Sequence, residues 1–145
     1  MSTKEIKALT RRLFEEFNKG KAAAMAIMDE LCATNIVYHG AGGEETRGLK
    51  DYKQHESEIF SAFPDLHMTI DDIVAEGDKV ATRFTMTATH KGEYKGVAPT
   101  NKKGTLEAIS IDRIVAGKFV EEWTKYDTLG LMQQLGVVPI PKKEK

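Results

Sequence analysis

The amino-acid sequence predicts a single α+β domain in which helices pack on one face of a curved, mostly antiparallel sheet. Helical periodicity is confined to the part of the chain before Pro64, and strand-like segments joined by short turns follow it. The length of 145 residues fits one domain, and neither a linker nor an internal repeat interrupts the order of elements. We therefore expect one domain over residues 1–139, followed by a solvated, lysine-rich tail over residues 140–145.

The first helix is predicted by a capping box and by one apolar face. Ser2 is followed by Glu5 at the capping-box spacing, and Gly20 marks the end of the helical pattern. The apolar face consists of Ile6, Leu9, Leu13 and Phe17. This pattern predicts an amphipathic helix that packs on the core.

Two more helices are predicted before Pro64. The alanine-rich segment 21–32 has high helix propensity and ends at Cys32, and the segment from Leu49 to Phe63 follows a helical period. Pro64 stops the latter because proline cannot continue a helix. Between them, NIVYH (residues 35–39) favours a strand, and the Gly-rich segment 40–48 is expected to be a loop.

The second half of the chain reads as a series of strands. Residues 66–74, 80–90, 105–115 and 119–126 have strand-like composition, and the short turns AEGDK and VAGK predict antiparallel hairpins. The longer segment between the second and third of these strands is typical of a functional lip over a pocket. A short helix, LGLMQQL, closes the fold and makes four helices in all.

Composition excludes several classes of function. The net charge of −1 gives no basic surface for nucleic acid, and the longest apolar run, residues 22–28, is too short to span a membrane. Cys32 is the only cysteine, so no internal disulfide can form, and we expect it to be a buried, inert thiol in a cytoplasmic protein. The histidines have no paired ligand spacing, and no metal site is expected.

Two passages of the sequence resemble a known family. They are residues 62–104, with A-F-P-D, T-H-K-G and P-T-N, and residues 117–139, with W-x-x-x-D and Q-L-G. These motifs resemble those of the SnoaL-like polyketide cyclases (ester cyclase family) of the nuclear-transport-factor-2-like superfamily. Asn101 stands where relatives have glycine, and asparagine tolerates the left-handed conformation that this turn needs.

The resemblance implies a fold and a class of reaction. It implies a cone-shaped α+β barrel of the SnoaL-like (cystatin-like) type, with a pocket at its open mouth, and a homodimer formed through the convex face of the sheet. It also implies a cofactor-free enzyme that closes a polyketide ring by intramolecular aldol condensation on a small apolar carbonyl compound, a class that includes polycyclic ligands. A pocket aspartate would act as general acid and base.

Asp127 matches that aspartate of the W-x-x-x-D motif. Side-chain alternation along a strand would place Trp123 and Asp127 on one wall of the pocket, on the same face as Phe119, Glu121 and Lys125. The alternative is that Asp127 only caps the final helix, although Thr128 is equally suited to that role. His39 is the expected histidine partner of Asp127, with a rim position beside the Gly-rich loop as its alternative.

Further side chains are expected to bind the substrate. Arg83 and Glu107 either face the pocket or lie on the outer or solvated part of the sheet, and the sequence leaves both possibilities open. His55 has no partner at a suitable spacing and is expected to be structural or solvated. The aromatic and apolar residues expected to line the pocket are Trp123, Phe14, Phe17, Phe60, Phe63 and Met86.

Other functions remain open at this point. Isomerisation or epoxide hydrolysis is the nearest alternative reaction, and epoxide opening would need an arginine and an aspartate that hold water together. A non-catalytic module that binds a small lipophilic ligand is the alternative from another class.

Overall fold

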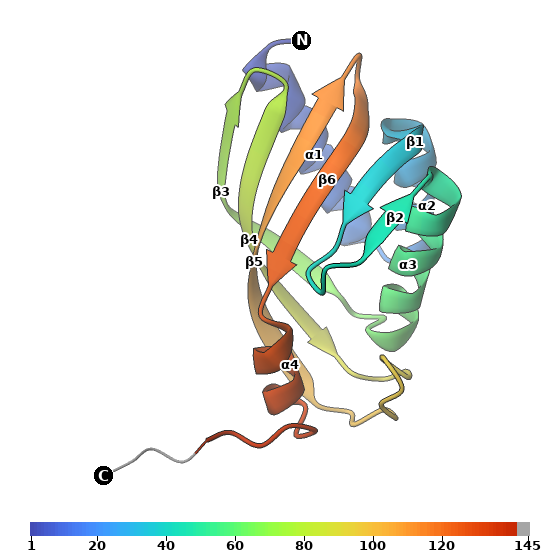
Figure 1. Cartoon of the computed structure of the whole chain (residues 1–145), viewed down its shortest axis with the longest axis vertical. Helices are drawn as coiled ribbons and strands as arrows, with labels where there is room; N and C mark the ends of the chain where they lie inside the picture. Colours follow the sequence, from blue (N-terminus) through green and yellow to red (C-terminus); the bar gives the residue numbers. More distant parts are fainter. Residues whose placement is uncertain (142–145) are drawn as a thin grey trace.

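A computed structural model gives the structure of residues 1–141 (Figure 1). Residues 142–145 of the expected tail lie outside the described residues. Within the described part, four helices accompany a six-stranded sheet. Their bounds are α1 Thr3–Phe17, α2 Lys21–Leu31, β1 Cys32–His39, β2 Glu45–Arg47, α3 Leu49–Ala62, β3 His67–Glu76, β4 Lys79–Thr89, β5 Lys103–Val115, β6 Lys118–Tyr126 and α4 Thr128–Gln134. The predicted α+β class is confirmed.

The sheet has the order β2-β1-β6-β5-β4-β3. Strands β3 to β6 form antiparallel hairpins as predicted, but β1 pairs with β6 in parallel, so the sheet is mixed. Helices α1, α2 and α3 lie on one side of the curved sheet, and α4 follows the end of β6 (Figure 1). We call the side that faces α1–α3 the inner face and the opposite side the outer face.

The apolar faces of the helices fill most of the inner side. Helix α1 begins with the predicted capping box, in which Ser2 accepts a hydrogen bond from the Glu5 backbone N–H. Its residues Ile6, Leu13 and Phe17 are buried against the core. The predicted first helix and its apolar face are therefore confirmed.

Of two local predictions near residues 32–47, the one for Cys32 was confirmed and the one for the Gly-rich segment was wrong. Cys32 is the C-cap of α2, as expected, and it also begins β1, where its backbone pairs with Phe119 in β6. It is a buried free cysteine, and burial raises the pKa of its thiol far above the usual range. The segment 40–48, expected to be a loop, contains the short strand β2, which pairs antiparallel with β1.

A register shift in the hairpin of β5 and β6 decides which side chains reach the inner face. Arg113 pairs with Glu121 but Ile114 pairs with Phe119, which leaves Val120 as an extra residue in β6. Phe119 is therefore buried on the inner face, while Glu121 and Trp123 lie on the outer face. The prediction that Phe119, Glu121 and Trp123 share one face was wrong because of this bulge.

The loop between β4 and β5 closes one end of the domain. Its Asn101 has φ 59°, which confirms the left-handed conformation expected there. Gly92 lies against the end of α3, and an added Cβ would be 2.2 Å from the backbone oxygen of Ser61. This close approach fixes the start of the loop on α3.

Among the described residues, the helices are all too short or too polar to cross a membrane.

Candidate functional site

A cavity of about 120 Å³ lies between the inner face of the sheet and helices α1 and α3. Its walls combine an apolar majority with a small group of polar side chains. The apolar lining comprises Leu13, Phe14, Phe17, Ile59, Phe63, Leu66, Met68, Phe84, Met86, Ala88, Gly104, Leu106 and Leu131. The polar lining comprises Tyr38, His55, Glu56, Tyr94, Glu122, Thr124 and Tyr126. An apolar pocket with a few convergent polar groups is the usual form of a small-molecule site.

Glu122 is the carboxyl group that β6 directs into this cavity. It accepts a hydrogen bond from the Tyr52 hydroxyl of α3 and another, 3.2 Å long, from the Thr124 hydroxyl. Burial raises the pKa of Glu122 to about 7, an effect that the two hydrogen bonds oppose and the nearby Glu56 increases. A carboxyl group with this pKa can both accept and donate a proton near neutral pH.

Tyr52 fixes Glu122 from the helical side. Its ring is buried and stacks on Tyr38 with ring centroids 4.7 Å apart. Burial, followed by the charge of Glu122, raises the pKa of the Tyr52 hydroxyl well above its ordinary value. The hydroxyl therefore keeps its proton and donates it in the hydrogen bond to Glu122.

His55 and Glu56 form a second polar pair on α3, across the cavity from the sheet. His55 Nδ1 lies 3.6 Å from Glu56 Oε1, and His55 Nε2 lies 3.7 Å from Glu44 Oε1. Interaction with Glu56 is the largest cause that raises the pKa of His55, while burial lowers it. His55 is therefore a cavity group with an enhanced tendency to carry a proton.

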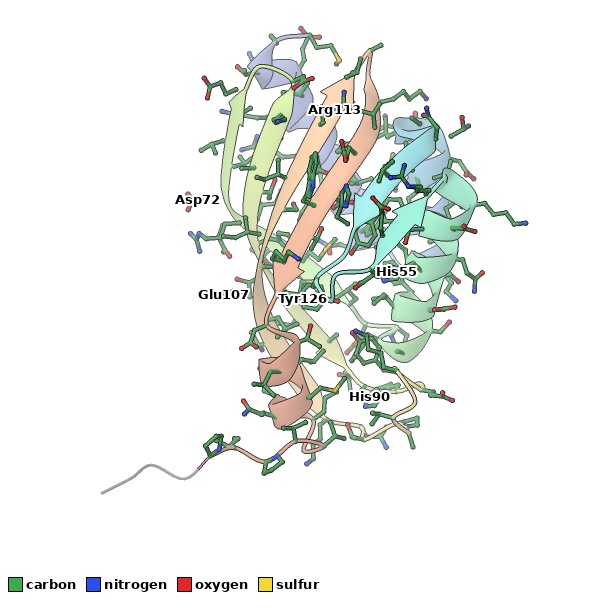
Figure 2. All side chains as sticks on the ribbon, viewed as in Figure 1. His55, Asp72, His90, Glu107, Arg113 and Tyr126 are labelled. Atoms are coloured by element: carbon green, nitrogen blue, oxygen red, sulfur yellow. The ribbon has the colours of Figure 1, made fainter. Side chains whose placement is uncertain are left out.

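Three tyrosine hydroxyls complete the polar lining. Burial raises the pKa of Tyr38 and Tyr126 beyond the usual range, so both remain protonated hydrogen-bond donors. Tyr94, from the loop between β4 and β5, contacts Tyr126 and packs edge-on against Phe63, with ring centroids 5.1 Å apart. The predicted lip thus supplies a cavity wall. In Figure 2, His55 and Tyr126 are labelled where α3 and the end of β6 approach the cavity.

Several predicted lining residues do lie at the cavity. Phe17 of α1, Phe63 at the end of α3 and Met86 of β4 are part of its wall, as is Phe14. Their assignment as substrate-binding residues stays a prediction. Phe60 instead is buried in the core beside Phe17, with ring centroids 5.8 Å apart.

Trp123 and His39 come together, but on the outer face. Their rings stack with centroids 5.2 Å apart and an interplanar angle of 8°. His39 Nε2 lies 2.7 Å from Glu121 Oε2, and this contact holds the imidazole on the same face. The expected position of Trp123 at the pocket was wrong, because the bulge in β6 changes which side chains share a face. His39 of β1 also lies outside the cavity lining, and its Nδ1, 3.7 Å from Glu45 Oε1, agrees with the alternative of a position beside the Gly-rich segment. The functional roles expected for both residues stay predictions.

Arg83 and Glu107 also lie on the outer face. Arg83 Nη2 is 2.7 Å from Asp72 Oδ2, and the hydrogen bond to Asp72 is the leading cause of a raised Arg83 pKa. Both Arg83 and Glu107 are exposed, and Figure 2 shows Asp72 and Glu107 projecting away from α3. Of the two possibilities that the sequence left open, the structure favours the outer position.

Asp127 is exposed and lies immediately after β6. Its side chain caps α4, since Oδ1 accepts a 2.8 Å hydrogen bond from the Gly130 backbone N–H. Thr128 is the first helical residue, so the expectation that it would free Asp127 from capping was wrong. In the part of the chain that the structure describes, Asp127 stands outside the cavity lining, and its catalytic role stays a prediction.

Glu122 and His55 were missed as site residues. Lys125, two residues from Trp123, was a usable signal, because a lysine does not suit the wall of an apolar cavity and so marks its own face of β6 as solvent-facing. His55 is followed directly by Glu56, but adjacent residues of a helix do not reveal a site, and its other neighbours, Glu44 and Tyr38, are near only in the fold.

The raised pKa of Glu122 predicts that the free energy of unfolding falls as pH rises from 4.5 to about 7. In this window the folded protein binds more protons than the unfolded chain, so stability decreases with pH. Glu122→Gln should flatten this part of a pH series of urea unfolding curves. Glu121→Gln, the same change on the outer face, should retain the wild-type slope. Equal slopes for wild type and Glu122→Gln would contradict the assignment.

Comparison with known proteins identifies the family of the chain and several relatives of similar structure. Residues 8–135 match the family described as SnoaL-like polyketide cyclase. The structure of AclR from Streptomyces galilaeus, described as a candidate hydroxylase, is 32% identical over 98% of this chain and 91% of AclR, with a TM-score of 0.85. IdmH from Streptomyces antibioticus, described as a candidate polyketide cyclase, is 30% identical over 90% of this chain and 98% of IdmH, with a TM-score of 0.77.

More distant structures share the fold. A protein from Catenulispora acidiphila with a ketosteroid isomerase-like fold is 14% identical and has a TM-score of 0.72 over 90% of this chain and 93% of that protein. A search of curated proteins finds no match. The family match covers nearly the whole domain, and the chain belongs to the SnoaL-like polyketide cyclase family.

Proposed function

We propose that this protein is a cofactor-free acid–base enzyme that acts on a small apolar carbonyl compound, and that intramolecular aldol condensation is its reaction. The observation that carries the proposal is Glu122, a carboxyl group with a pKa of about 7 in the wall of an apolar cavity. Family membership supports the reaction type, and IdmH, described as a candidate polyketide cyclase, is a relative of similar fold.

Glu122 would act first as a base. In its ionised form it removes a proton from the carbon next to a ligand carbonyl, and the electron pair of the C–H bond becomes an enolate. The enolate carbon then attacks a second carbonyl of the same molecule, which forms the new C–C bond and leaves an alkoxide. The alkoxide takes back a proton, so the reaction consumes no oxidant, reductant or other reactant.

The remaining polar groups would stabilise oxygen charge. The protonated hydroxyls of Tyr38 and Tyr126 can donate hydrogen bonds to a carbonyl oxygen that becomes negative. His55, whose pKa is raised by Glu56, can donate a proton to the alkoxide from the α3 side. The apolar walls exclude water and strengthen each of these interactions.

Two carboxyl groups compete for the catalytic role. Asp127 is supported by the family motif, whereas its side chain is exposed and bonded to the start of α4. Glu122 lies in the cavity and has the shifted pKa that proton transfer near neutral pH requires. We therefore assign the acid–base role to Glu122, and Asp127 to the support of α4.

Proton transfer can be measured without the natural substrate. Phenylacetone, a one-ring ketone with acidic α-protons, should exchange these protons for deuterium faster with the protein than in buffer, as followed by NMR in D₂O. Glu122→Gln should slow the catalysed exchange by about 100-fold or more, the usual loss for a general base. Asp127→Asn should keep the wild-type rate, since an amide oxygen can still cap α4.

The opposite pattern would contradict the assignment. Loss of exchange in Asp127→Asn with full exchange in Glu122→Gln would return the catalytic role to Asp127. Saturable binding of phenylacetone without any exchange would favour the second candidate function, a non-catalytic ligand-binding module, which the apolar cavity by itself also supports.

Epoxide hydrolysis has less support. The Arg–Asp pair that it would need exists as Arg83 and Asp72, but this pair lies on the outer face, away from the cavity. Within the described residues, the cavity lining contains neither arginine nor lysine.

We also propose that the outer face forms a homodimer interface. The strand registers align a row of side chains across it: Val74, Ala81, Ile111, Trp123 and His39. Val74 and Ile111 are exposed, and Ile109 in the next row is 54% exposed. A continuous apolar row rimmed by charges such as Arg83 and Asp72 is typical of a surface that pairs with a second copy.

Ile111→Glu should convert the dimer into a monomer, because it places a charge in the centre of the apolar row. Sedimentation equilibrium would measure the mass. Leu129→Glu, which changes an exposed apolar residue of α4 in the same way, should leave the dimer intact. A monomeric wild-type protein would contradict the proposed interface.

A further inference from the structure

A strip of buried polar side chains lies behind Glu122 in the inner face of the sheet. Thr82 of β4 is directly opposite Ser110 of β5, and Asp112, two residues further along β5, is directly opposite Glu122 of β6. Because directly paired residues and residues two apart on a strand share one face, these side chains form a connected row. Thr82, Ser110 and Asp112 are each at most 2% exposed.

This strip contains polar atoms without partners. Thr82 Oγ1, Ser110 Oγ and Asp112 Oδ1 have no hydrogen-bond partner among the described residues. A buried neutral carboxylic acid without a partner costs a few kcal/mol at most, whereas a buried and unpaired carboxylate costs far more. The surroundings of Asp112 therefore favour its protonated form.

The position of Glu122 reinforces this preference. Side chains directly opposite each other in an antiparallel pair have Cβ atoms about 4.5–5.5 Å apart, so Asp112 and Glu122 are neighbours in one buried layer. Two carboxyl groups this close cannot both ionise readily in a medium that excludes water. One member of the pair must keep its proton near neutral pH.

The neighbouring elements decide which member that is. Glu122 has the Tyr52 and Thr124 hydroxyls as donors to its ionised form. Of the charged groups on α3, His55 lowers the pKa of Glu122 and Glu56 raises it. Asp112 has none of these donors. Its charge would also raise the pKa of the buried Cys32 thiol in β1, which the charge of Lys118 lowers. The donors thus stabilise negative charge on Glu122 and leave Asp112 without such support.

We propose that Asp112 remains a protonated carboxylic acid at neutral pH, so that Glu122 is the member of the pair that exchanges protons. This inference rests on the proposed role of Glu122 and extends it to a residue outside the cavity lining. Burial and then the charge of Glu122 raise the pKa of Asp112 well above its ordinary value, in agreement with the geometry. The pair therefore titrates as a unit in which Glu122 ionises first.

The protonation state of Asp112 affects the pKa of Glu122. A neutral acid behind Glu122 adds no negative charge at the moment when Glu122 ionises, so the pKa of Glu122 stays near 7 and does not rise out of the useful range. Its O–H group also provides a hydrogen-bond donor in the same buried layer.

Carboxyl ¹³C NMR of the unliganded protein tests the proposal. Asp112→Asn replaces a neutral acid by a neutral amide of the same shape, so the titration midpoint of Glu122 should equal that of the wild type. Asp72→Asn, the same change on the outer face, serves as the matched control. A midpoint that falls by a full pH unit in Asp112→Asn alone would overturn the proposal, because it would show that Asp112 carries a charge when Glu122 titrates.

Infrared spectroscopy in D₂O provides the second measurement. The C=O band of a protonated carboxylic acid should persist above the Glu122 midpoint, disappear in Asp112→Asn and titrate at lower pH in Glu122→Gln. Absence of the band above the midpoint, or a band that Glu122→Gln does not move, would overturn the coupling. These measurements need no ligand. They can therefore overturn the proposal for Asp112 while the deuterium exchange of phenylacetone supports the proposed function, or support it while the exchange experiment contradicts that function.

Discussion

The alternation of side chains along β6 is the constraint on which the rest of the structure depends. The bulge at Val120 separates Phe119 from the face to which simple alternation would assign it. From there on, Glu122, Thr124 and Tyr126 face the cavity, while Glu121, Trp123 and Lys125 face outwards. A shift by one residue would exchange these sets and place a lysine in the apolar cavity.

This arrangement buries the Glu122 carboxyl group, which lowers the stability of the fold but gives the group a pKa suited to proton transfer. The apolar walls remove water from Glu122, which raises its pKa, and the Tyr52 hydroxyl limits the rise by donating to the ionised form. The same hydrogen bond ties α3 to the sheet at the cavity. A site of this kind stores a destabilising group that the larger core, built around residues such as Ile6, Met28 and Ile36, has to offset.

The fold could be predicted from the sequence in most of its parts. Capping, periodicity and turn chemistry are local, and they identified α1, α3 and the strands β3 to β6 to within a few residues. The parallel pairing of β1 with β6 could not be read in this way, since no hairpin joins segments so far apart in the chain. Strand β2, only Glu45–Arg47, is too short to give a pattern.

The site was predicted less well than the fold, for physical reasons. Strict alternation along β6 cannot reveal a bulge, so Trp123 was assigned to the same face as Phe119 and therefore to the wrong face. His39 was preferred over His55 because the neighbours of His55 come from β1 and from the loop before β2. Phe17, Phe63 and Met86 do line the cavity, because apolar helix and strand faces necessarily turn inwards.

Family membership fixes the fold and the general class of this protein, while the chemistry depends on individual side chains. The central claim is that an apolar cavity holds the Glu122 carboxyl group in a state that exchanges protons near neutral pH. Titration of Glu122 by carboxyl ¹³C NMR in the wild-type protein tests it most directly. A midpoint near 7 would agree with the account, and a midpoint near the ordinary value of 4.5 would contradict it.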